Sequence, residues 1–419
     1  MIDPMNQDHS PKCSASSTRR TASKSGLSGL DRWTRAAFGL LEGLAVGRLT
    51  VILPDGRTVS FGGAASGPDA ILRLHDLGVT RRFILGGHLA FAEAYMDGLV
   101  ESPDPVAVIE LFERNKHAFN QGNPDGLVRI LVRRILHWLN ANSRRGSRRN
   151  ATYHYDLGNA FYARWLDPGM TYSSAVFEDG QQDLEAAQTA KNRRMAEKLR
   201  LRPGQRLLEI GCGWGGFAVY AAQEFGVEVV GVTLSREQHA YAVERAQRAG
   251  VSERVRFEIR DYRDVAGQFD AITAIEMFEA VGETYWTSFF TQLHDRLVPG
   301  GRAALQVITI SEEGFEDYRA NPDFIQRYIF PGGMLPTRRH LLALGEAHGL
   351  RVDAEEAFGA DYARTLAAWR TRFLANWPAI ERQGFDTRFR RMWDYYLVYC
   401  EGGFRGGCID VRQIVYTRS

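Results

Sequence analysis

Strand-like and helix-like hydrophobic patterns begin at about residue 27 of the chain. In RLTVILPDGRTVSFG (48–62), polar and apolar positions alternate around a Pro-Asp-Gly turn, which predicts a β-hairpin. Segments 84–100 and 102–115 have apolar residues at helical spacing, with Gly98 near the end of the first and Ser102 as the candidate cap of the second. We therefore expect a small α+β domain over residues 27–124, ending near Asn123 and Pro124.

The larger part of the chain, residues 151–419, alternates strand and helix patterns. Five short apolar runs each predict a buried parallel strand: RLLEIGC, EVVGVTL, RVRFEIR, FDAITAIEM and RAALQVITI. Helical patterns such as FAVYAAQEFG and REQHAYAVERAQRAG lie between these runs. This order predicts the α/β class, with a doubly wound sheet that binds its ligand at the carboxyl ends of the strands.

Two further segments lie outside these patterns. Residues 1–26 are polar and lack the apolar core of a signal peptide, so we expect a disordered arm. The linker 125–150 predicts an amphipathic helix with Arg129, Arg133 and Arg134 between its apolar positions, and it contains no acidic residue from Leu127 to Asn150. Such a helix can lie on an anionic lipid surface. The alternative is an interdomain helix whose arginines face water.

The composition fits a soluble globular protein, with 44% hydrophobic and 24% charged residues. No apolar run reaches the roughly 18 residues of a membrane-spanning helix. A net charge of +2 argues against nucleic-acid binding through bulk charge. The four cysteines, Cys13, Cys212, Cys400 and Cys408, have no paired spacing, so we expect a reduced, cytoplasmic protein without a metal site.

The stretch LLEIGCGWGGFA (207–218) is a glycine turn between a strand and a helix, and its spacing also fits dinucleotide-binding loops. A dinucleotide site needs an acidic residue at the end of the next strand. That strand ends in Thr233 and Leu234, with Gln238 following, and Glu237 belongs to the next helix pattern. No carboxylate stands at the end of this strand, which favours S-adenosylmethionine, and NAD is the alternative.

Six motifs carry a family resemblance: YHYDLGNAFYARWLDPGMTYSSAVF, LLEIGCGWGGFA, VVGVTLSREQ, MFEAVG, YIFPGGMLP and FGADY. In this order they resemble the cyclopropane-fatty-acyl-phospholipid synthases and their mycolic-acid relatives, from about residue 80 onward. The resemblance implies an amino-terminal lipid-associated domain and a Rossmann-like class I methyltransferase domain. It also implies methyl transfer from S-adenosylmethionine to the cis double bond of an acyl chain.

The resemblance implies a set of residues around the cofactor. They are Tyr172, Ser173, Glu209, Gly211, Cys212, Gly213, Trp214, Gly215, Thr233, Leu234, Gln238, Tyr262 and Arg263. Simple packing at a strand end is an equally good interpretation of Tyr262. His154 and Tyr155 are expected to form the framework of a lid over the cofactor rather than to act in catalysis.

Methylation of an alkene leaves a carbocation, which aromatic faces can stabilise and from which a base must take a proton. Loss of a proton from the delivered methyl closes a cyclopropane, and loss of a proton from a neighbouring carbon gives a methyl-branched or methylene chain. In the resembled enzymes a bound bicarbonate is the base. The positions that would hold it are Glu279, Tyr362, Gln306, and the backbone around Ile308 and Ser174. Cys400 matches a further active-site position, and a packed thiol is an equally good interpretation of it.

Two of these positions depart from the family pattern. Ser174 replaces a cysteine, which changes little if the backbone makes the contact. Gln306 replaces a histidine and cannot carry positive charge, so bicarbonate binding and ring closure are both open. The methyl-branched or methylene product is slightly favoured. Glu276, three residues before Glu279, is interpreted as a surface or capping acid, with a role as substitute base as the alternative.

The sequence thus predicts a cytoplasmic enzyme, peripheral at the inner membrane surface, that methylates unsaturated acyl chains of bilayer phospholipids. One alternative is a methyltransferase of soluble small molecules, which would leave the first domain without a role. Another is a non-catalytic lipid-binding module. A homodimer is left open, and no nucleic-acid partner is expected.

Overall fold

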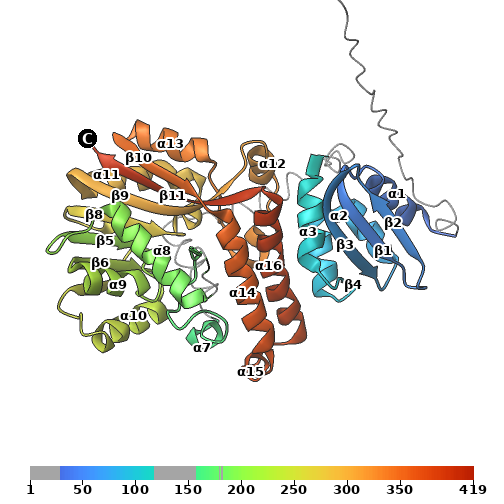
Figure 1. Cartoon of the computed structure of the whole chain (residues 1–419), viewed down its shortest axis with the longest axis horizontal. Coiled ribbons are helices and arrows are strands. Elements are labelled where there is room, and N and C mark those ends of the chain that lie inside the picture. The colour runs from blue at the N-terminus through green and yellow to red at the C-terminus, as the bar shows by residue number, and fades with distance from the viewer. Residues whose placement is uncertain (1–28, 118–156, 179, 181–182) are drawn as a thin grey trace, which may run out of the picture.

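The protein is described by a computed structural model covering residues 29–117, 157–178, 180 and 183–419, and two β-sheets organise it (Figure 1). The smaller sheet and its helices comprise α1 (Arg32–Leu41), β1 (Val46–Ile52), β2 (Thr58–Gly62), β3 (Ala65–Leu74), α2 (Gly78–Met96), β4 (Val100–Glu101) and α3 (Pro105–Arg114). We refer to these elements as the N-terminal part. The remaining elements form the C-terminal part.

The N-terminal sheet has the strand order β2-β1-β3-β4. β1 and β2 pair in antiparallel fashion, which confirms the predicted hairpin. Helix α2 is interrupted at Gly87, whose backbone is not helical (φ 58°, ψ −143°). The predicted cap of α3 is wrong. Asp104, not Ser102, accepts the hydrogen bond from Ala107 N (3.1 Å), because Pro105 fixes the first helical position directly after Asp104.

The C-terminal part is built on a seven-stranded sheet of order β10-β11-β9-β8-β5-β6-β7. Its strands are β5 (Arg206–Ile210), β6 (Glu228–Thr233), β7 (Val255–Ile259), β8 (Phe269–Ile275), β9 (Leu297–Ile310), β10 (Leu350–Ala357) and β11 (Ile409–Arg418). β5 to β9 are the five predicted strands, and they pair in parallel. The α/β prediction is confirmed. β10 and β11, which add an antiparallel edge, were not predicted.

Helices cover this sheet and extend from it toward the N-terminal part (Figure 1). They are α7 (Asn159–Tyr162), α8 (Leu184–Leu199), α9 (Gly216–Phe225), α10 (Arg236–Arg248), α11 (Trp286–Arg296), α12 (Phe315–Ala320), α13 (Arg338–Ala347), α14 (Gly359–Ala375), α15 (Trp377–Glu381) and α16 (Thr387–Gly406). Short 3-10 turns at Tyr262–Asp264, Phe278–Ala280 and Glu283–Tyr285 and a π-helical turn at Ile325–Ile329 complete it.

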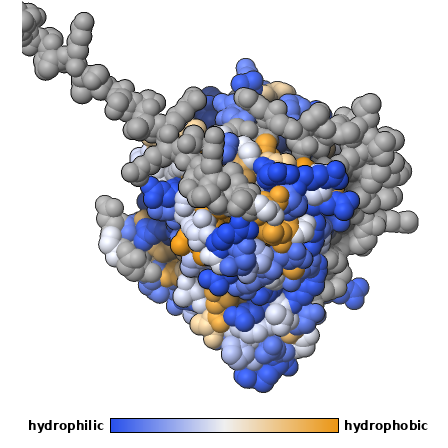
Figure 2. All heavy atoms as spheres, turned by 90° about the vertical axis from the view of Figure 1, so that its right-hand side faces the viewer, coloured by the Kyte–Doolittle hydropathy of each residue, from blue (hydrophilic) through white to orange (hydrophobic). Residues whose placement is uncertain are grey.

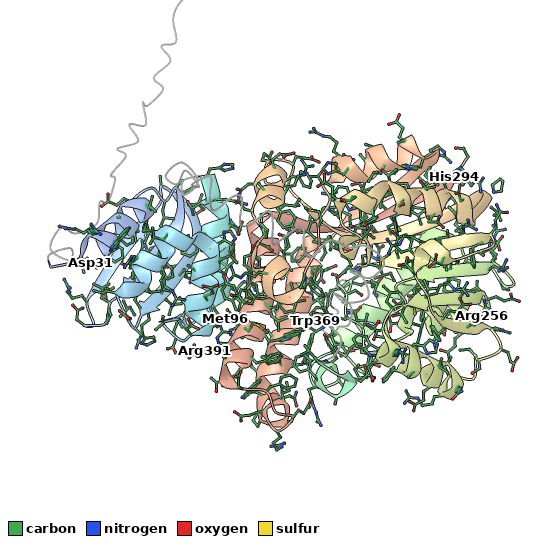
Figure 3. The ribbon with its side chains drawn as sticks, turned by 180° about the vertical axis from the view of Figure 1, so that it is seen from behind. Asp31, Met96, Arg256, His294, Trp369 and Arg391 are labelled. Carbon is green, nitrogen blue, oxygen red and sulfur yellow. The ribbon has the colours of Figure 1, made fainter. Side chains whose placement is uncertain are left out.

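The two parts share one hydrophobic core where α16 packs against α2 and α3. Met96 belongs to the same buried cluster as Trp369 of α14, and Figure 3 labels Met96 beside Arg391 at this junction. Asp394 of α16 accepts hydrogen bonds from Tyr95 Oη (2.5 Å) and Arg370 Nε (2.7 Å). A half-buried charged network and a continuous core therefore fix the N-terminal part against α16.

Several predictions fall outside the described residues. These are the arm 1–26, the basic helix 125–150, the lid residues His154 and Tyr155, and the domain boundaries at 124 and 150. Among the helices that the structure describes, none has the length and apolar character needed to cross a membrane.

Candidate active site

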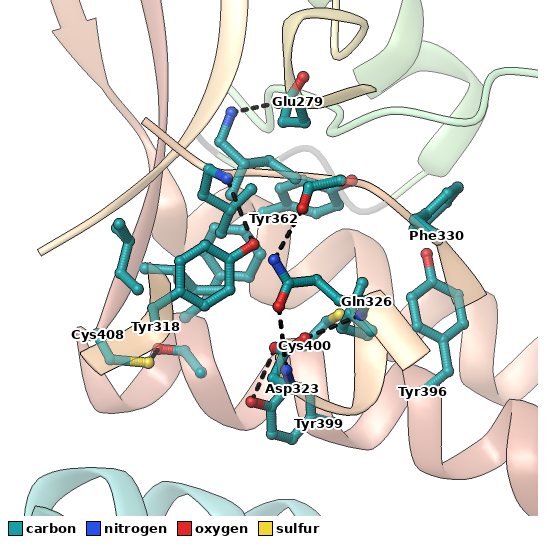
Figure 4. A pocket seen from close by; sticks show the side chains of 18 of the residues that line it. Glu279, Tyr318, Asp323, Gln326, Phe330, Tyr362, Tyr396, Tyr399, Cys400 and Cys408 are labelled. Carbon is teal, nitrogen blue, oxygen red and sulfur yellow. Dashed lines mark hydrogen bonds between the residues drawn. The ribbon is translucent and has the colours of Figure 1, made fainter. Parts of the chain in front are cut away.

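Most of the predicted site residues line one large cavity of about 1360 Å³. Figure 4 shows part of its wall, with Glu279, Tyr362 and Cys400 labelled. The cavity opens at the carboxyl ends of β5, β6 and β8 and extends between α14, α16 and the N-terminal part. Ligands of doubly wound sheets bind at this edge because the strand-to-helix turns leave a crevice there. The cavity is therefore the candidate site for cofactor and substrate together.

The glycine turn forms the floor of the crevice between β5 and α9. Gly211 and Gly213 both have left-handed backbone, with φ of 80° and 50°. A Cβ at Gly211 would lie 2.5 Å from the Met277 side chain, whereas a Cβ at Gly213 would meet no protein atom within 4 Å. Gly213 thus leaves open space at the cavity wall, which is what close approach of a ligand to backbone requires.

Two buried polar groups stand beside the glycine turn. Glu209 is 3% exposed, and its Oε2 has no hydrogen-bond partner among the described residues. Burial raises the pKa of Glu209 to about 8, and the nearby Lys191 ammonium opposes this rise. Burial also lowers the pKa of Lys191 to about 8. A buried carboxyl oxygen without a hydrogen-bond partner is costly, so this site fits a ligand that forms hydrogen bonds with Glu209, as the polar groups of S-adenosylmethionine can.

The next strand ends in groups that can bind a ribose. Thr233 Oγ1 donates to Gln238 Oε1 (2.9 Å) and accepts from Ser235 N (3.2 Å), and Ser235 caps α10. Thr233, Leu234 and Gln238 all line the cavity. Hydroxyl and amide groups stand here in place of a carboxylate.

Other predicted cofactor residues also reach the cavity: Tyr172, Ser173, Cys212, Trp214, Tyr262 and Arg263. Arg263 donates twice to Asp261, at 2.8 and 2.6 Å, and its guanidinium lies 5.5 Å from the Tyr262 ring centre. Gly215 does not line the cavity. Its Cβ position would lie 2.7 Å from Phe257, so Gly215 is needed for packing of α9 against β7.

The interpretation of Glu276 as a surface or capping acid is wrong. Glu276 follows directly after β8 and lines the cavity, and its carboxylate accepts three hydrogen bonds. The donors are Ser174 N (2.7 Å), Gln306 Nε2 (2.7 Å) and Tyr362 Oη (2.5 Å). Burial raises the pKa of Glu276, and the three donors counteract that rise. The backbone of Glu276 is left-handed (φ 50°), a strained state for a residue with a Cβ.

Gln306 and Ser174 are fully buried and do not line the cavity. Gln306 on β9 also donates to Ser174 O (3.2 Å) and accepts from Gln413 Nε2 of β11 (3.0 Å). Gln413 comes from a strand that the sequence did not predict. It fixes the amide of Gln306 so that its NH₂ group faces Glu276.

Glu279 lies one 3-10 turn beyond Glu276 and makes a different set of contacts. Its Oε1 accepts a hydrogen bond from Ile308 N (2.5 Å), and its Oε2 is buried with no partner in the described part of the chain. Burial first, and the charge of Glu276 second, raise the pKa of Glu279 to about 8. Three donors favour the ionised form of Glu276, whereas a pKa of about 8 keeps Glu279 mostly protonated near neutral pH.

Aromatic side chains surround the space next to these carboxyls. Tyr172 Oη lies 2.7 Å from Tyr396 Oη, and the Tyr362 and Phe404 ring centres are 4.5 Å apart. Cys400 lines the same wall, and burial raises its pKa far above the usual range, so it remains a neutral thiol. This wall is suited to a hydrocarbon chain and, through its ring faces, to a positive charge on it.

Lys191 is a site residue that the sequence reasoning missed. It is 1% exposed on α8 and donates to Ser173 Oγ (3.2 Å), while Gln188, one turn earlier, donates to Ser173 O (2.8 Å). Thr365 Oγ1 accepts from Ala175 N (3.1 Å) on the other side. α8 and α14 thus hold the 173–175 backbone that presents Ser174 N to Glu276. A lysine among alanines in QTAKNRRMA was the signal available in the sequence.

Comparisons with known proteins agree with this geometry. The family model for mycolic acid cyclopropane synthetase matches residues 142–414. The chain is 38% identical over 355 residues to the cyclopropane-fatty-acyl-phospholipid synthase of Escherichia coli K12, covering 83% of this chain and 88% of that protein. It is 37% identical over 359 residues to a tuberculostearic acid methyltransferase of Mycobacterium tuberculosis, with 81% of each chain covered.

Solved structures give the same result for the C-terminal part. The cyclopropane synthase MmaA2 from Mycobacterium tuberculosis superposes with a TM-score of 0.61 at 31% identity, over 65% of this chain and 98% of that one. The mycolic acid cyclopropane synthase CmaA1, complexed with SAH and CTAB, superposes with a TM-score of 0.61 at 30% identity, again over 65% and 98%.

Proposed function

Because this chain belongs to the mycolic acid cyclopropane synthetase family, we propose that it methylates the cis double bond of unsaturated acyl chains in membrane phospholipids. Membership makes it an S-adenosylmethionine-dependent methyltransferase, as the sequence predicted. The relatives include both a cyclopropane synthase and a tuberculostearic acid methyltransferase, so the product of this chain has to be argued from its own residues.

One observation supports a specific mechanism. The three donors expected to hold a bicarbonate, namely the Ser174 amide, residue 306 and Tyr362, all bind the carboxylate of Glu276 instead. Two acidic anions cannot share such a buried set of donors without strong repulsion. Glu276 is therefore the resident base, and the enzyme needs no bicarbonate.

The cofactor, when bound, supplies an electrophilic methyl group. Glu209, the glycine turn, Thr233 and Gln238 would hold it, since these groups line the crevice. The alkene gains the methyl and becomes a carbocation on the acyl chain. Tyr172, Tyr396 and the neighbouring rings stabilise this charge and exclude water, which would otherwise add to it.

Glu276 then accepts a proton from the acyl chain, and the electrons of that C–H bond neutralise the cation. Loss of the proton from the carbon next to the cation forms an alkene beside a methyl branch. A hydride shift from the methylated carbon, followed by loss from the methyl, forms a methylene group. Glu276 is attached to the end of β8, so its carboxylate cannot move within the site as a free anion can. We assign the methyl-branched or methylene product to this fixed position.

The neutral state of Glu279 supports the role of Glu276. A protonated Glu279 leaves a single negative charge in the pair, so the proton acceptor is defined. Lys191 adds the compensating positive charge on the far side of Ser173, which favours the ionised form of Glu276.

A lipid substrate is favoured over a soluble small molecule because the cavity wall beside the carboxyls is apolar and aromatic. On the end of the molecule shown in Figure 2, apolar side chains are exposed among hydrophilic ones, and Ile71 and Leu85 of the N-terminal part are 38% and 51% exposed. These features support docking at a bilayer surface, as does the basic stretch 127–150, which lies outside the described residues.

The function is tested by incubating the protein with vesicles of a cis-unsaturated phospholipid and S-adenosylmethionine labelled in its methyl group. Label should appear in the acyl chains, and the protein should float with anionic vesicles in a salt-sensitive way. Label recovered only in water-soluble products would establish the small-molecule alternative. Cofactor binding without any transfer would establish the non-catalytic one.

A further inference from the structure

The active-site cavity continues into the N-terminal part. There its walls are side chains of α1, β1, β3 and α2, including Phe38, Leu49, Val51, Leu72, Phe83 and Phe91. We call this section of the cavity the N-terminal lobe. Leu49 and Val51 are at most 1% exposed and form the packed base of the lobe, whereas Phe83 and Phe91 are half-buried and present its open surface. All six side chains are apolar, and the lobe therefore suits hydrocarbon.

The cavity wall becomes polar where the two parts of the molecule meet. Glu113 at the end of α3 and Lys116 just after it line the cavity on one side, and Asp317 of α12 lines it on the other. Lys116 Nζ lies 4.0 Å from Asp317 Oδ2, across the junction. Glu113 Oε2 is buried and has no hydrogen-bond partner among the described residues. Hydrocarbon is unfavourable against such groups, so a polar section of a ligand belongs here.

The size of the cavity supports more than one apolar occupant. Its volume of about 1360 Å³ exceeds the roughly 300–1000 Å³ of ordinary ligand pockets. The cofactor and the chain being methylated occupy the C-terminal end in the proposed function. The N-terminal lobe and the polar section are then without an occupant.

A diacyl phospholipid has two apolar chains joined by a polar glycerol phosphate, the same order as apolar wall, polar junction and apolar lobe. We propose that the N-terminal lobe binds the second acyl chain of the lipid whose first chain is methylated. The site then selects lipids with two chains over lipids with one. This inference rests on the proposed function for the identity of the substrate.

The direct test compares a diacyl phosphatidylethanolamine with the matching lysophospholipid that carries the same unsaturated chain, both in detergent micelles. We expect kcat/KM for methyl transfer to be at least tenfold higher for the diacyl lipid. Equal values for the two lipids would overturn the inference and leave acyl methylation standing. Failure to methylate either lipid would instead overturn the proposed function.

Two neighbouring alanines of α1 provide a matched pair of variants. Ala37 lines the cavity and is half-buried, whereas Ala36 is exposed and lies outside the wall. Ala37→Trp should lower kcat/KM for the diacyl lipid to the value for the lysolipid and leave the lysolipid value unchanged. Ala36→Trp should alter neither. An equal loss on both lipids with Ala37→Trp would contradict the inference.

A measurement on the unaltered protein guards against a variant that fails to fold. A diacyl lipid with a diazirine at the end of its saturated chain should crosslink to peptides containing residues 37–51 or 72–91. Crosslinks confined to α14 and α16 would place that chain outside the N-terminal lobe and overturn the inference.

Discussion

The cofactor crevice and the proposed base site, which is Glu276 with its three hydrogen-bond donors, adjoin the same cavity, yet they are assembled in different ways. The crevice is formed mainly by consecutive segments, the β5–α9 turn, the end of β6 and the start of α10, and its groups from Glu209 to Gln238 lie within 30 residues of one another. The base site joins Ser174, Glu276, Gln306 and Tyr362, from four distant segments. A local turn is specified by its own residues, whereas the base site depends on the whole sheet being in register.

This difference explains where the chain follows its family and where it departs. The crevice keeps the glycines and polar groups expected for the cofactor. In the proposed base site, Glu276 binds the donors that the family resemblance assigns to a bound anion. The two sites should therefore respond to substitution independently.

The largest effect is expected for Glu276→Gln. Glutamine keeps the size of the side chain and an oxygen for Ser174 N and Gln306, but it cannot accept the proton. Loss of a positioned base costs about 10²–10⁴-fold. We expect kcat to fall in that range while the Kd of S-adenosylmethionine changes less than threefold, measured by initial rates and calorimetry. Turnover within a factor of three of the unaltered enzyme would exclude Glu276 as the base.

Glu276→Gly combined with Gln306→His sharpens this prediction. Glycine relieves the left-handed backbone at φ 50° and empties the anion position, and histidine adds a donor that can carry charge. We expect the double variant to depend on added bicarbonate and to form some cyclopropane, whereas bicarbonate depletion barely slows the unaltered enzyme. The readout is the fatty acid methyl esters with and without bicarbonate.

In the crevice, Gly213→Val should weaken S-adenosylmethionine binding at least a hundredfold, because the new side chain would occupy the open space beside the turn. Gly204→Val is the matched control. Gly204 also has left-handed backbone (φ 80°) and no atom near its Cβ position, but it lies outside the cavity wall. Each variant should lose about 1–2 kcal/mol of stability from backbone strain. Equal cofactor affinity in both would show that Gly213 does not face the ligand.

A smaller effect, at most about tenfold on kcat, is expected for Glu279→Gln, because glutamine keeps the neutral charge of protonated Glu279 and loses only its acid O–H group. Its pKa of about 8 means that the neutral form, which we take as the active one, is lost as the pH rises past 8. The unaltered enzyme should lose activity on that alkaline side, and Glu279→Gln should flatten this limb of the pH profile.

Stability should follow the same titration. The folded protein retains a proton on Glu279 that the unfolded chain releases near its usual pKa of 4.5, so Glu279 lowers the free energy of unfolding as the pH rises from about 4.5 to 8. Glu279→Gln should therefore raise Tm more at pH 9 than at pH 5. An equal change at both values would contradict the raised pKa.

The smallest effect is expected for Ser235→Ala. Ser235 Oγ accepts the hydrogen bond from Gln238 N (3.2 Å) at the start of α10. Loss of this cap should cost about 1 kcal/mol of stability, with kcat unchanged within a factor of two. A larger loss of kcat, checked beside thermal denaturation, would mean that the two sites are coupled.

The sequence predicted those features that depend on consecutive residues. The β1–β2 hairpin, the strands β5 to β9 and the glycine turn follow from local periodicity and turn residues. β10 was missed because an edge strand rich in charge, as in LRVDAEEA, resembles solvent-exposed helix, and β11 was missed because polar residues interrupt its apolar positions, as in IDVRQIVYTR. The positive φ of Glu276 and the amide contact from Gln413 arise only when distant strands pair, so no local pattern could show that Glu276 is buried.

The central claim is that the chain's own carboxylate replaces a bound anion as base and so directs the product. The most direct test is gas chromatography with mass spectrometry of the fatty acid methyl esters formed by the unaltered enzyme from a cis-monounsaturated phospholipid in bicarbonate-free buffer. A methyl-branched or methylene chain formed at the same rate as with bicarbonate is the predicted result. A product that is solely cyclopropane, or a rate that collapses without bicarbonate, would contradict the claim.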